Sequence, residues 1–227
     1  MKAEDFQRSY GNVAEQSYMR QVYQWMAAGL VLTGFMAYWG ASNLTLLRAL
    51  AGGGFLVLML VELGLVFWLT ASIMKISAQA AVTGFLVYSA LNGLSMCFIF
   101  AVYTGASIAS TFFIAASTFA AVSLFGWTVK GDLTSVRGFL FMGLIGVLIA
   151  SAVNIFLKST PLDWIISYVG LAVFIGLTAY DTQQLKYIHQ SGSGSTSQLA
   201  ILGALRLYLD FINMFMLLLR LFGRRRD

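Results

Sequence analysis

Long apolar segments, separated by short polar connections, follow one another through almost the whole chain. Each segment holds about 20 predominantly apolar residues, the length that a helix needs to cross the hydrocarbon core of a bilayer. The connections are rich in Gly, Ser, Asn and Lys and are too short for a soluble domain. The pattern therefore predicts an all-α membrane protein with seven transmembrane helices in one bundle, over Val22 to Gly40, Gly52 to Ser72, Ala80 to Tyr103, Ser107 to Thr128, Val136 to Leu157, Leu162 to Leu185 and Leu199 to Phe222.

Polar segments flank the predicted transmembrane domain, which covers residues 22–222. A polar amino-terminal tail occupies residues 1–21 and a basic tail occupies residues 223–227. The first apolar run has no clear small-residue cleavage site, so it is expected to be a retained helix and not a signal peptide. The junction of the third and fourth helices is the weakest boundary, because only Tyr103 to Ala106 separate them. One broken helix there would reduce the count to six.

Composition supports the membrane class. Hydrophobic residues make up 59% of the chain and charged residues 10%, with a mean hydropathy of +0.80. Soluble domains carry about 25% charged residues. The formal net charge of +5 sits mostly beside the apolar runs, which indicates contact with anionic lipid headgroups and not with nucleic acid. The single cysteine, Cys97, lies inside an apolar segment and is expected to pack there.

Basic residues in the short connections predict the orientation of the chain. With seven helices, the amino-terminal side holds Lys2, Arg8, Arg20, Lys75, Lys130, Arg137 and Lys186, whereas the other side holds Arg48 and Lys158. The amino terminus is therefore predicted to be cytoplasmic. Arg224 to Arg226 contradict this rule, because an odd number of helices places them outside. Either early helices dominate the orientation, which we favour, or the last helix does not fully cross.

Four ionisable residues lie inside the predicted helices, away from the extreme ends: Glu62, Asp181, Arg206 and Asp210. An Asp or Arg at the centre of a transmembrane helix costs about 2.5–3.5 kcal/mol on insertion scales, so such residues usually face a protein interior or a water-filled path. Arg206 and Asp210 are four residues apart on one helix face and could simply neutralise each other. Asp181 could also reach the membrane surface beside neighbouring polar residues.

Asp181 and Asp210 lie on the last two helices, which are expected to be antiparallel neighbours. With the last helix starting one turn later than predicted, the two carboxylates would be level with each other. Two carboxylates held close in a low-dielectric site share a proton and titrate as a coupled pair, so they can sense pH. Deprotonated, they also offer hard oxygen ligands that suit Ca²⁺. Glu62 could supply a third carboxylate.

Two motifs resemble the paired signatures of the transmembrane Bax inhibitor motif family, in particular its bacterial inner-membrane members. They are GLTAYDTQQLK, at Gly176 to Lys186, and LYLDFINMFMLLLRLFG, at Leu207 to Gly223. The resemblance extends to QVYQWMAAGLVLTG near the start and VYTGASIASTF in the middle. It implies seven helices with the last one central, in the bacterial inner membrane. It also implies a pH-sensitive Ca²⁺ leak channel with no bound cofactor, whose sensor is a pair of aspartates.

The resemblance assigns the two sensor aspartates to Asp181 and Asp210 and matches an acidic residue of the second helix to Glu62. One position departs from it. Some relatives carry an arginine near the end of the second helix that latches onto the aspartates, and Ile73 stands there in this chain. Lys75 is the cation nearest to that position. Arg206, one turn before Asp210, is a candidate counter-charge to the aspartates, and this assignment comes from its position and not from the resemblance.

Functions of other classes remain open to different degrees. Tyr180-Asp181 followed by Asp210 imitates the order of intramembrane aspartyl proteases, but LYLD replaces the expected Gly-x-Gly-Asp. His189 is the only histidine, so no Ser-His pair or two-histidine metal site is expected inside the bundle, and we predict no enzyme. A regulatory or scaffold protein that acts on a membrane protease or other membrane-protein partner, and a proton-coupled transporter, remain alternatives.

Overall fold

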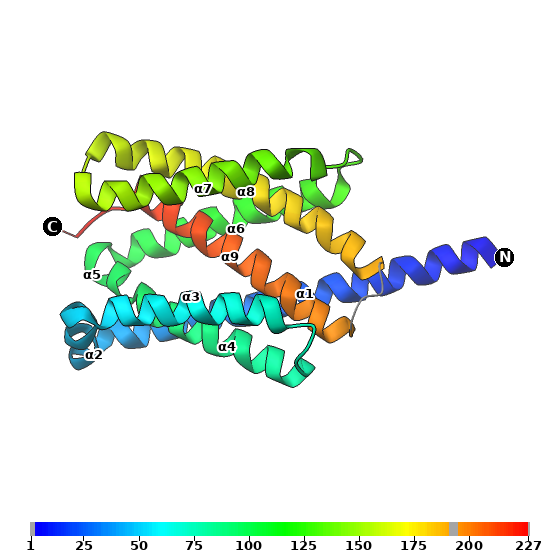
Figure 1. Ribbon diagram of the computed structural model, residues 1–227, viewed down its shortest axis with the longest axis horizontal. Helices are drawn as coiled ribbons and strands as arrows, with labels where there is room; N and C mark the ends of the chain where they lie inside the picture. Colours follow the sequence, from blue (N-terminus) through cyan, green and yellow to red (C-terminus); the bar gives the residue numbers. More distant parts are fainter. Residues whose placement is uncertain (1–2, 191–194, 227) are drawn as a thin grey trace. The chain divides into compact units, whose positions relative to one another are not determined.

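The fold is helical throughout the part of the chain that the structure describes. This computed structural model describes residues 3–190 and 195–226, and the side chains of residues 14–188 and 195–226 (Figure 1). The α-helices are α1 Ala3–Ser42, α2 Leu44–Ala49, α3 Phe55–Ser72, α4 Ala78–Ser95, α5 Ile99–Val102, α6 Gly105–Thr128, α7 Thr134–Leu157, α8 Thr160–Gln190 and α9 Thr196–Phe222. A π-helical turn, Leu50–Gly54, precedes α3, and a 3₁₀ turn, Met96–Phe98, precedes α5.

Six stretches of the described chain are long and apolar enough to cross a membrane. They are Leu44–Ser72, Ala78–Val102, Gly105–Thr128, Thr134–Leu157, Thr160–Ile188 and Thr196–Phe222. Five of them contain a predicted helix, and Ala78–Val102 ends one residue before the predicted end of the third helix at Tyr103. The second to seventh predicted helices are therefore confirmed by length and composition. The first predicted helix, Val22 to Gly40, lies within α1 and stays a prediction as a membrane span. The polar segment before it is continuous with it, because α1 begins at Ala3.

The segment before α3 corrects the predicted connection between the first two spans. Residues 41–51 form the predicted connection between the first two spans, yet α2 begins directly after Asn43. The Asn43 side chain accepts a hydrogen bond from the Leu46 N–H at 3.1 Å, which caps the new helix. The chain then kinks at Gly53, whose φ of +108° is open to glycine without steric cost. The predicted start at Gly52 therefore marks a kink and not the end of a loop.

The junction of the third and fourth predicted spans is a true break. The helical stretch from α4 ends at Val102, and α6 begins at Gly105. Thr104 caps α6, because its hydroxyl accepts a hydrogen bond from the Ser107 N–H at 3.3 Å. The two spans are separate, and the alternative of one broken helix is wrong.

The chain divides into two compact units. Unit 1 contains Met1–Val102 and Leu185–Tyr208, and unit 2 contains Tyr103–Gln184 and Leu209–Asp227. In unit 1, α1 packs closely on α4, since a side chain at Gly93 would overlap the backbone of Thr33. In unit 2, a cluster of buried side chains joins α7 to α8, with Leu140 between Val173, Phe174, Leu177 and Tyr180.

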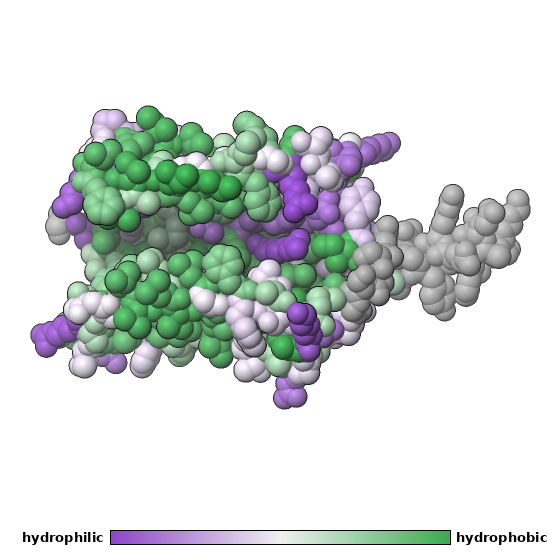
Figure 2. Space-filling view, viewed as in Figure 1, coloured by the Kyte–Doolittle hydropathy of each residue, from purple (hydrophilic) through white to green (hydrophobic). Residues whose placement is uncertain are grey.

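Two helices expose long apolar faces of the kind that lipid covers. Only 6% of the spanning window is buried in the stretch that contains α3, and the same holds for α7, against 67% in α9. Hydrophobic side chains gather over both helices in Figure 2. Phe67 of α3 is 72% exposed and Phe156 of α7 is 86% exposed. The prediction that the last helix lies at the centre of the whole bundle stays a prediction, although α9 contributes residues to both units.

The carboxy-terminal tail pairs with the junction between α5 and α6 in unit 2. The Thr104 N–H donates to the Arg224 carbonyl at 3.1 Å, and the Arg224 N–H donates to the Ser107 hydroxyl at 2.8 Å. Tyr103 and Arg225 also form an isolated antiparallel bridge. Four spanning helices separate these two segments, so they must end on the same side of a membrane. The tail contacts agree with a last helix that crosses fully, and which side this is stays a prediction.

Candidate functional site

Asp181 lies near the end of α8, in a part of the helix whose neighbours are buried. Asp181 itself is half-buried, between Tyr180 and Thr182, which are both buried. Gln183 is only 2% exposed because it bonds the connection between α6 and α7. Its amide oxygen accepts from the Leu133 N–H at 2.8 Å, and its amide nitrogen donates to the Gly131 carbonyl at 2.8 Å. This end of α8 is therefore held by protein and is not simply extended towards water.

Small residues bring α6 against α8 beside Asp181. A side chain at Gly126 would overlap the Ala179 carbonyl oxygen, so the two backbones touch there. The Thr182 hydroxyl donates to the Ser123 hydroxyl at 3.4 Å. Gly126 and Ser123 thus allow close packing of α6 on α8, as small residues do between membrane helices.

Asp210 lies in the middle of α9 and is 5% exposed. The next residue, Phe211, packs edge-to-face on Phe119 of α6, with ring centroids 5.6 Å apart. Phe119 and Ser123 are four residues apart, so they are about one turn apart on the same face of α6. Thr182, next to Asp181, contacts α6 at Ser123, and Phe211, next to Asp210, contacts it at Phe119. These two contacts lie about one turn apart on the same face of α6. Both aspartates belong to unit 2. That their carboxylates are level and form a pair stays a prediction.

Glu62 lies in unit 1, in a group of buried and half-buried polar side chains. It is 9% exposed on α3 and faces Asn92 and Ser95 of α4. Its Oε1 atom is buried and has no hydrogen-bond partner among the described residues. Asn92 also receives a hydrogen bond from the Tyr208 hydroxyl of α9 at 3.1 Å. The Tyr208 hydroxyl lies 2.7 Å from the Thr33 hydroxyl of α1.

The sequence pointed to Glu62 but not to the polar residues around it. Thr33 is 3% exposed and Tyr208 is fully buried, although neither residue is charged and neither drew notice in the sequence. One local signal was present, because Tyr88, Asn92 and Ser95 are spaced four and three residues apart on one face of α4. Tyr88 belongs to the same group, since its ring packs edge-to-face on Tyr208 with centroids 6.0 Å apart.

Arg206 and Ile73 also belong to unit 1. The charge of Arg206 acts on Tyr18 of α1, whose hydroxyl donates to the Leu199 carbonyl at 3.3 Å. Burial raises the pKa of the Tyr18 phenol to about 12, and Arg206 opposes that rise. Ile73 is fully buried, as suits an apolar side chain. The role of Arg206 as a counter-charge to the aspartates stays a prediction, and the side chain of His189 lies outside the described residues.

Carboxylates are sparse in the described part of the chain. No group of three or more His, Cys, Asp or Glu side chains lies close enough there to hold a metal ion. A resident Ca²⁺ ion takes 6–8 oxygen ligands, usually with several carboxylates.

Comparison with known proteins identifies the family. The model of the family described as "Inhibitor of apoptosis-promoting Bax1" matches residues 15–227. The chain belongs to this Bax inhibitor family. It is 51% identical over 217 residues to the inner membrane protein YbhL of Escherichia coli, with 93% of each chain covered. It is 43% identical over 213 residues to the protein RP147 of Rickettsia prowazekii, covering 92% of this chain and 90% of that one.

Membership in the Bax inhibitor family confirms the resemblance drawn from the two signature motifs. A protein of Borreliella burgdorferi, 38% identical over 218 residues and covering 94% of both chains, extends the same likeness to a further bacterium. The matched region includes all six candidate spans and both aspartates.

Proposed function

We propose that this Bax inhibitor family member is a pH-sensitive cation leak channel, with Ca²⁺ as its main permeant ion, in a bacterial inner membrane. The likeness to the inner membrane protein YbhL and the six candidate spans support this location. The amino terminus faces the cytoplasm in this proposal.

One observation carries the assignment of the sensor. The neighbours of Asp181 and Asp210, Thr182 and Phe211, contact α6 at Ser123 and Phe119, which lie one turn apart. This arrangement supports a carboxylate pair at one depth in unit 2. Two such carboxylates in a low-dielectric site cannot both ionise easily, so they hold a shared proton over a range of pH.

Gain or loss of that proton changes the local charge by one unit. A deprotonated pair attracts a cation, and a protonated pair does not. Since Asp210 is 5% exposed, this charge change acts where little water screens it. It biases the packing of α8 and α9 between a closed and an open arrangement.

The test is Ca²⁺ influx into proteoliposomes at several pH values. We expect flux in the native protein that varies with pH, and loss of that variation in both Asp181→Asn and Asp210→Asn. Asp163→Asn is the matched control, because Asp163 is a carboxylate on the same α8 that is 39% exposed and pairs with Arg220. It should keep the pH profile of the native chain.

Two results would contradict the proposal. Absence of Ca²⁺ flux above empty liposomes at every pH would remove the leak function and favour a regulatory or scaffold protein. Saturable uptake that stops when the proton gradient is collapsed would favour a proton-coupled transporter.

A further inference from the structure

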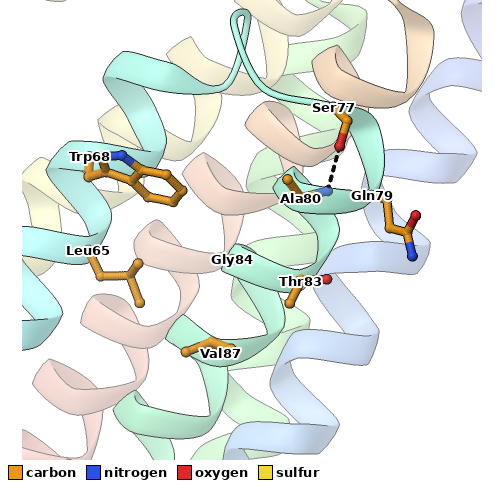
Figure 3. Close-up of a pocket in the computed structure, with 8 residues that line it drawn as sticks. All are labelled: Leu65, Trp68, Ser77, Gln79, Ala80, Thr83, Gly84 and Val87. Atoms are coloured by element: carbon orange, nitrogen blue, oxygen red, sulfur yellow. Dashed lines mark hydrogen bonds between the residues drawn. The ribbon is translucent and has the colours of Figure 1, made fainter.

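A groove opens on the outer surface of unit 1, between α3 and α4, close to the turn that joins them. Its volume is about 530 Å³ (Figure 3). Leu65 and Trp68 extend from α3 towards α4, and Val87 closes the far end. Gly84 lets α4 approach α3 closely at the middle of the groove, since a Cβ atom there would lie 3.0 Å from Leu69 and 3.6 Å from Trp68.

The apolar part of the groove faces the lipid. Trp68 is 49% exposed and Val87 is 46% exposed, and both lie in helices that are long and apolar enough to cross a membrane. Trp68 is one turn from the end of α3, at Ser72, which is the depth at which tryptophan gathers in membrane proteins. Hydrocarbon is therefore the surrounding medium of this part of the groove.

The opposite end of the groove is polar. Ser77, Gln79 and Thr83 line it at the start of α4. The Ser77 hydroxyl accepts a hydrogen bond from the Ala80 N–H at 3.2 Å, which fixes the first turn of the helix.

The turn that leads to this polar end carries a positive charge. Lys75 is exposed, two residues before Ser77. Its backbone N–H donates to the Ser72 carbonyl at 2.7 Å, so the turn that carries it is ordered by its own hydrogen bonds. A lysine at the end of a spanning helix attracts anionic headgroups.

We infer that this groove binds one phospholipid with an anionic headgroup. Its acyl chain lies along Leu65, Trp68 and Val87, and its headgroup lies beside Lys75 and the polar start of α4. The order of charge, polar groups and apolar wall along the groove is the order of headgroup, ester region and chain in such a lipid. An apolar helix of a partner would leave the Lys75 charge without an anionic group.

The site is joined to the last helix. The Gln198 amide of α9 donates to the carbonyl of Ile76, in the same turn as Lys75. A lipid seated there therefore stabilises the turn that α9 also holds. This inference goes beyond the proposed ion path and does not depend on it.

The test is lipid binding to the purified protein in detergent, read by native mass spectrometry with phosphatidylglycerol and phosphatidylethanolamine as probes. The native chain should retain one phosphatidylglycerol with about fivefold preference over phosphatidylethanolamine, the size expected for one lysine near an anionic headgroup. Lys75→Gln should bring the two lipids to about equal retention. Val87→Trp, which fills the groove from an exposed position, should lose the bound lipid.

Ile145→Trp is the matched control, since Ile145 is 53% exposed on the apolar face of α7 and lies outside the groove. It should bind as the native chain does. Equal lipid retention by Val87→Trp and the native chain would overturn the site, and an unchanged preference in Lys75→Gln would overturn the anionic headgroup. Loss of a protein dimer in Val87→Trp, with no change in bound lipid, would assign the groove to a second copy of the chain instead.

Discussion

The hydroxyl groups of Tyr208 and Thr33 lie 2.7 Å apart and fully inside unit 1. Tyr208 also approaches the Asn92 amide oxygen at 3.1 Å, and Thr33 approaches the Ser89 carbonyl at 2.8 Å. Two hydroxyl protons thus serve three contacts, because each hydroxyl has one proton to donate. Either Tyr208 donates to Asn92 and Thr33 to Tyr208, or Tyr208 donates to Thr33 and Thr33 to Ser89. The pair has two alternative arrangements that link α1, α4 and α9.

Removing the Tyr208 hydroxyl should cost stability without disturbing the packing. Tyr208→Phe keeps the ring that packs on Phe85, with centroids 5.6 Å apart, but leaves Asn92 and Thr33 short of one partner each. We expect a loss of about 0.6–1.5 kcal/mol in the free energy of unfolding, in line with buried hydrogen bonds in membrane proteins. Denaturant unfolding in detergent measures it. Tyr187→Phe, at a 50% exposed position, is the control and should have no effect; an equal effect of both changes would contradict the hydrogen-bond role.

The contact between Gly126 and Ala179 should tolerate no side chain. Gly126→Ala forces α6 away from α8, and overpacking of this kind costs about 1–3 kcal/mol. We expect a lower melting temperature and, because the contact lies two residues from Asp181, an altered pH profile of flux. Gly138→Ala on α7 is the control, since nothing lies within 4 Å of a Cβ atom there. A Gly126→Ala variant as stable as Gly138→Ala would show that the two helices are not in the contact described.

Much of this fold was predictable from the apolar pattern, and some of it was not. The pattern placed six spans correctly because each needs about 20 apolar residues, and that requirement is local. It missed α2, since an Asn43 cap and a glycine kink at Gly53 let a helix continue where polar residues suggested a loop.

Only the charged residues of the candidate site could be predicted from the sequence. Asp181, Asp210 and Glu62 stand out because a charge inside a span is costly. Thr33 and Tyr208 carry no such mark, and their burial depends on which faces of α1 and α9 meet α4. That is set by contacts between residues far apart in the sequence, such as Thr33 and Ser89, which are 56 positions apart. Tertiary packing of this kind leaves little local trace in the sequence.

Asp132 should make stability depend on pH from outside the membrane. Its carboxylate accepts a hydrogen bond from the Thr134 N–H at 2.8 Å at the start of α7. That backbone bond first, and then the Thr134 hydroxyl, lower the pKa of Asp132. A folded-state pKa below the unfolded one adds stability that is present above the unfolded pKa and is lost as pH falls through the folded value.

The expected result is a difference in melting temperature between the native chain and Asp132→Ala that is present at neutral pH and shrinks as pH falls. Asp132→Asn should lie between the two at neutral pH, because it keeps an acceptor oxygen and loses the charge. Melting curves over a pH series give the answer. A difference that stays constant down to the lowest pH would mean that the carboxylate charge contributes nothing.

Glu62 and Tyr208 should be energetically coupled through Asn92, which contacts both. When Tyr208→Phe frees the Asn92 amide oxygen, the amide can reorient towards Glu62, so the cost of changing Glu62 should depend on residue 208. Residues that share a partner usually couple by about 0.5 kcal/mol or more. A double-mutant cycle of Glu62→Gln and Tyr208→Phe, measured by unfolding in detergent, should therefore be non-additive by at least that amount.

The same cycle with Tyr187→Phe in place of Tyr208→Phe is the control. It should be additive, because Tyr187 is half exposed to the surroundings. Additivity in both cycles would mean that Asn92 does not transmit the state of Glu62 to α9, and the buried cluster would then be a set of separate hydrogen bonds.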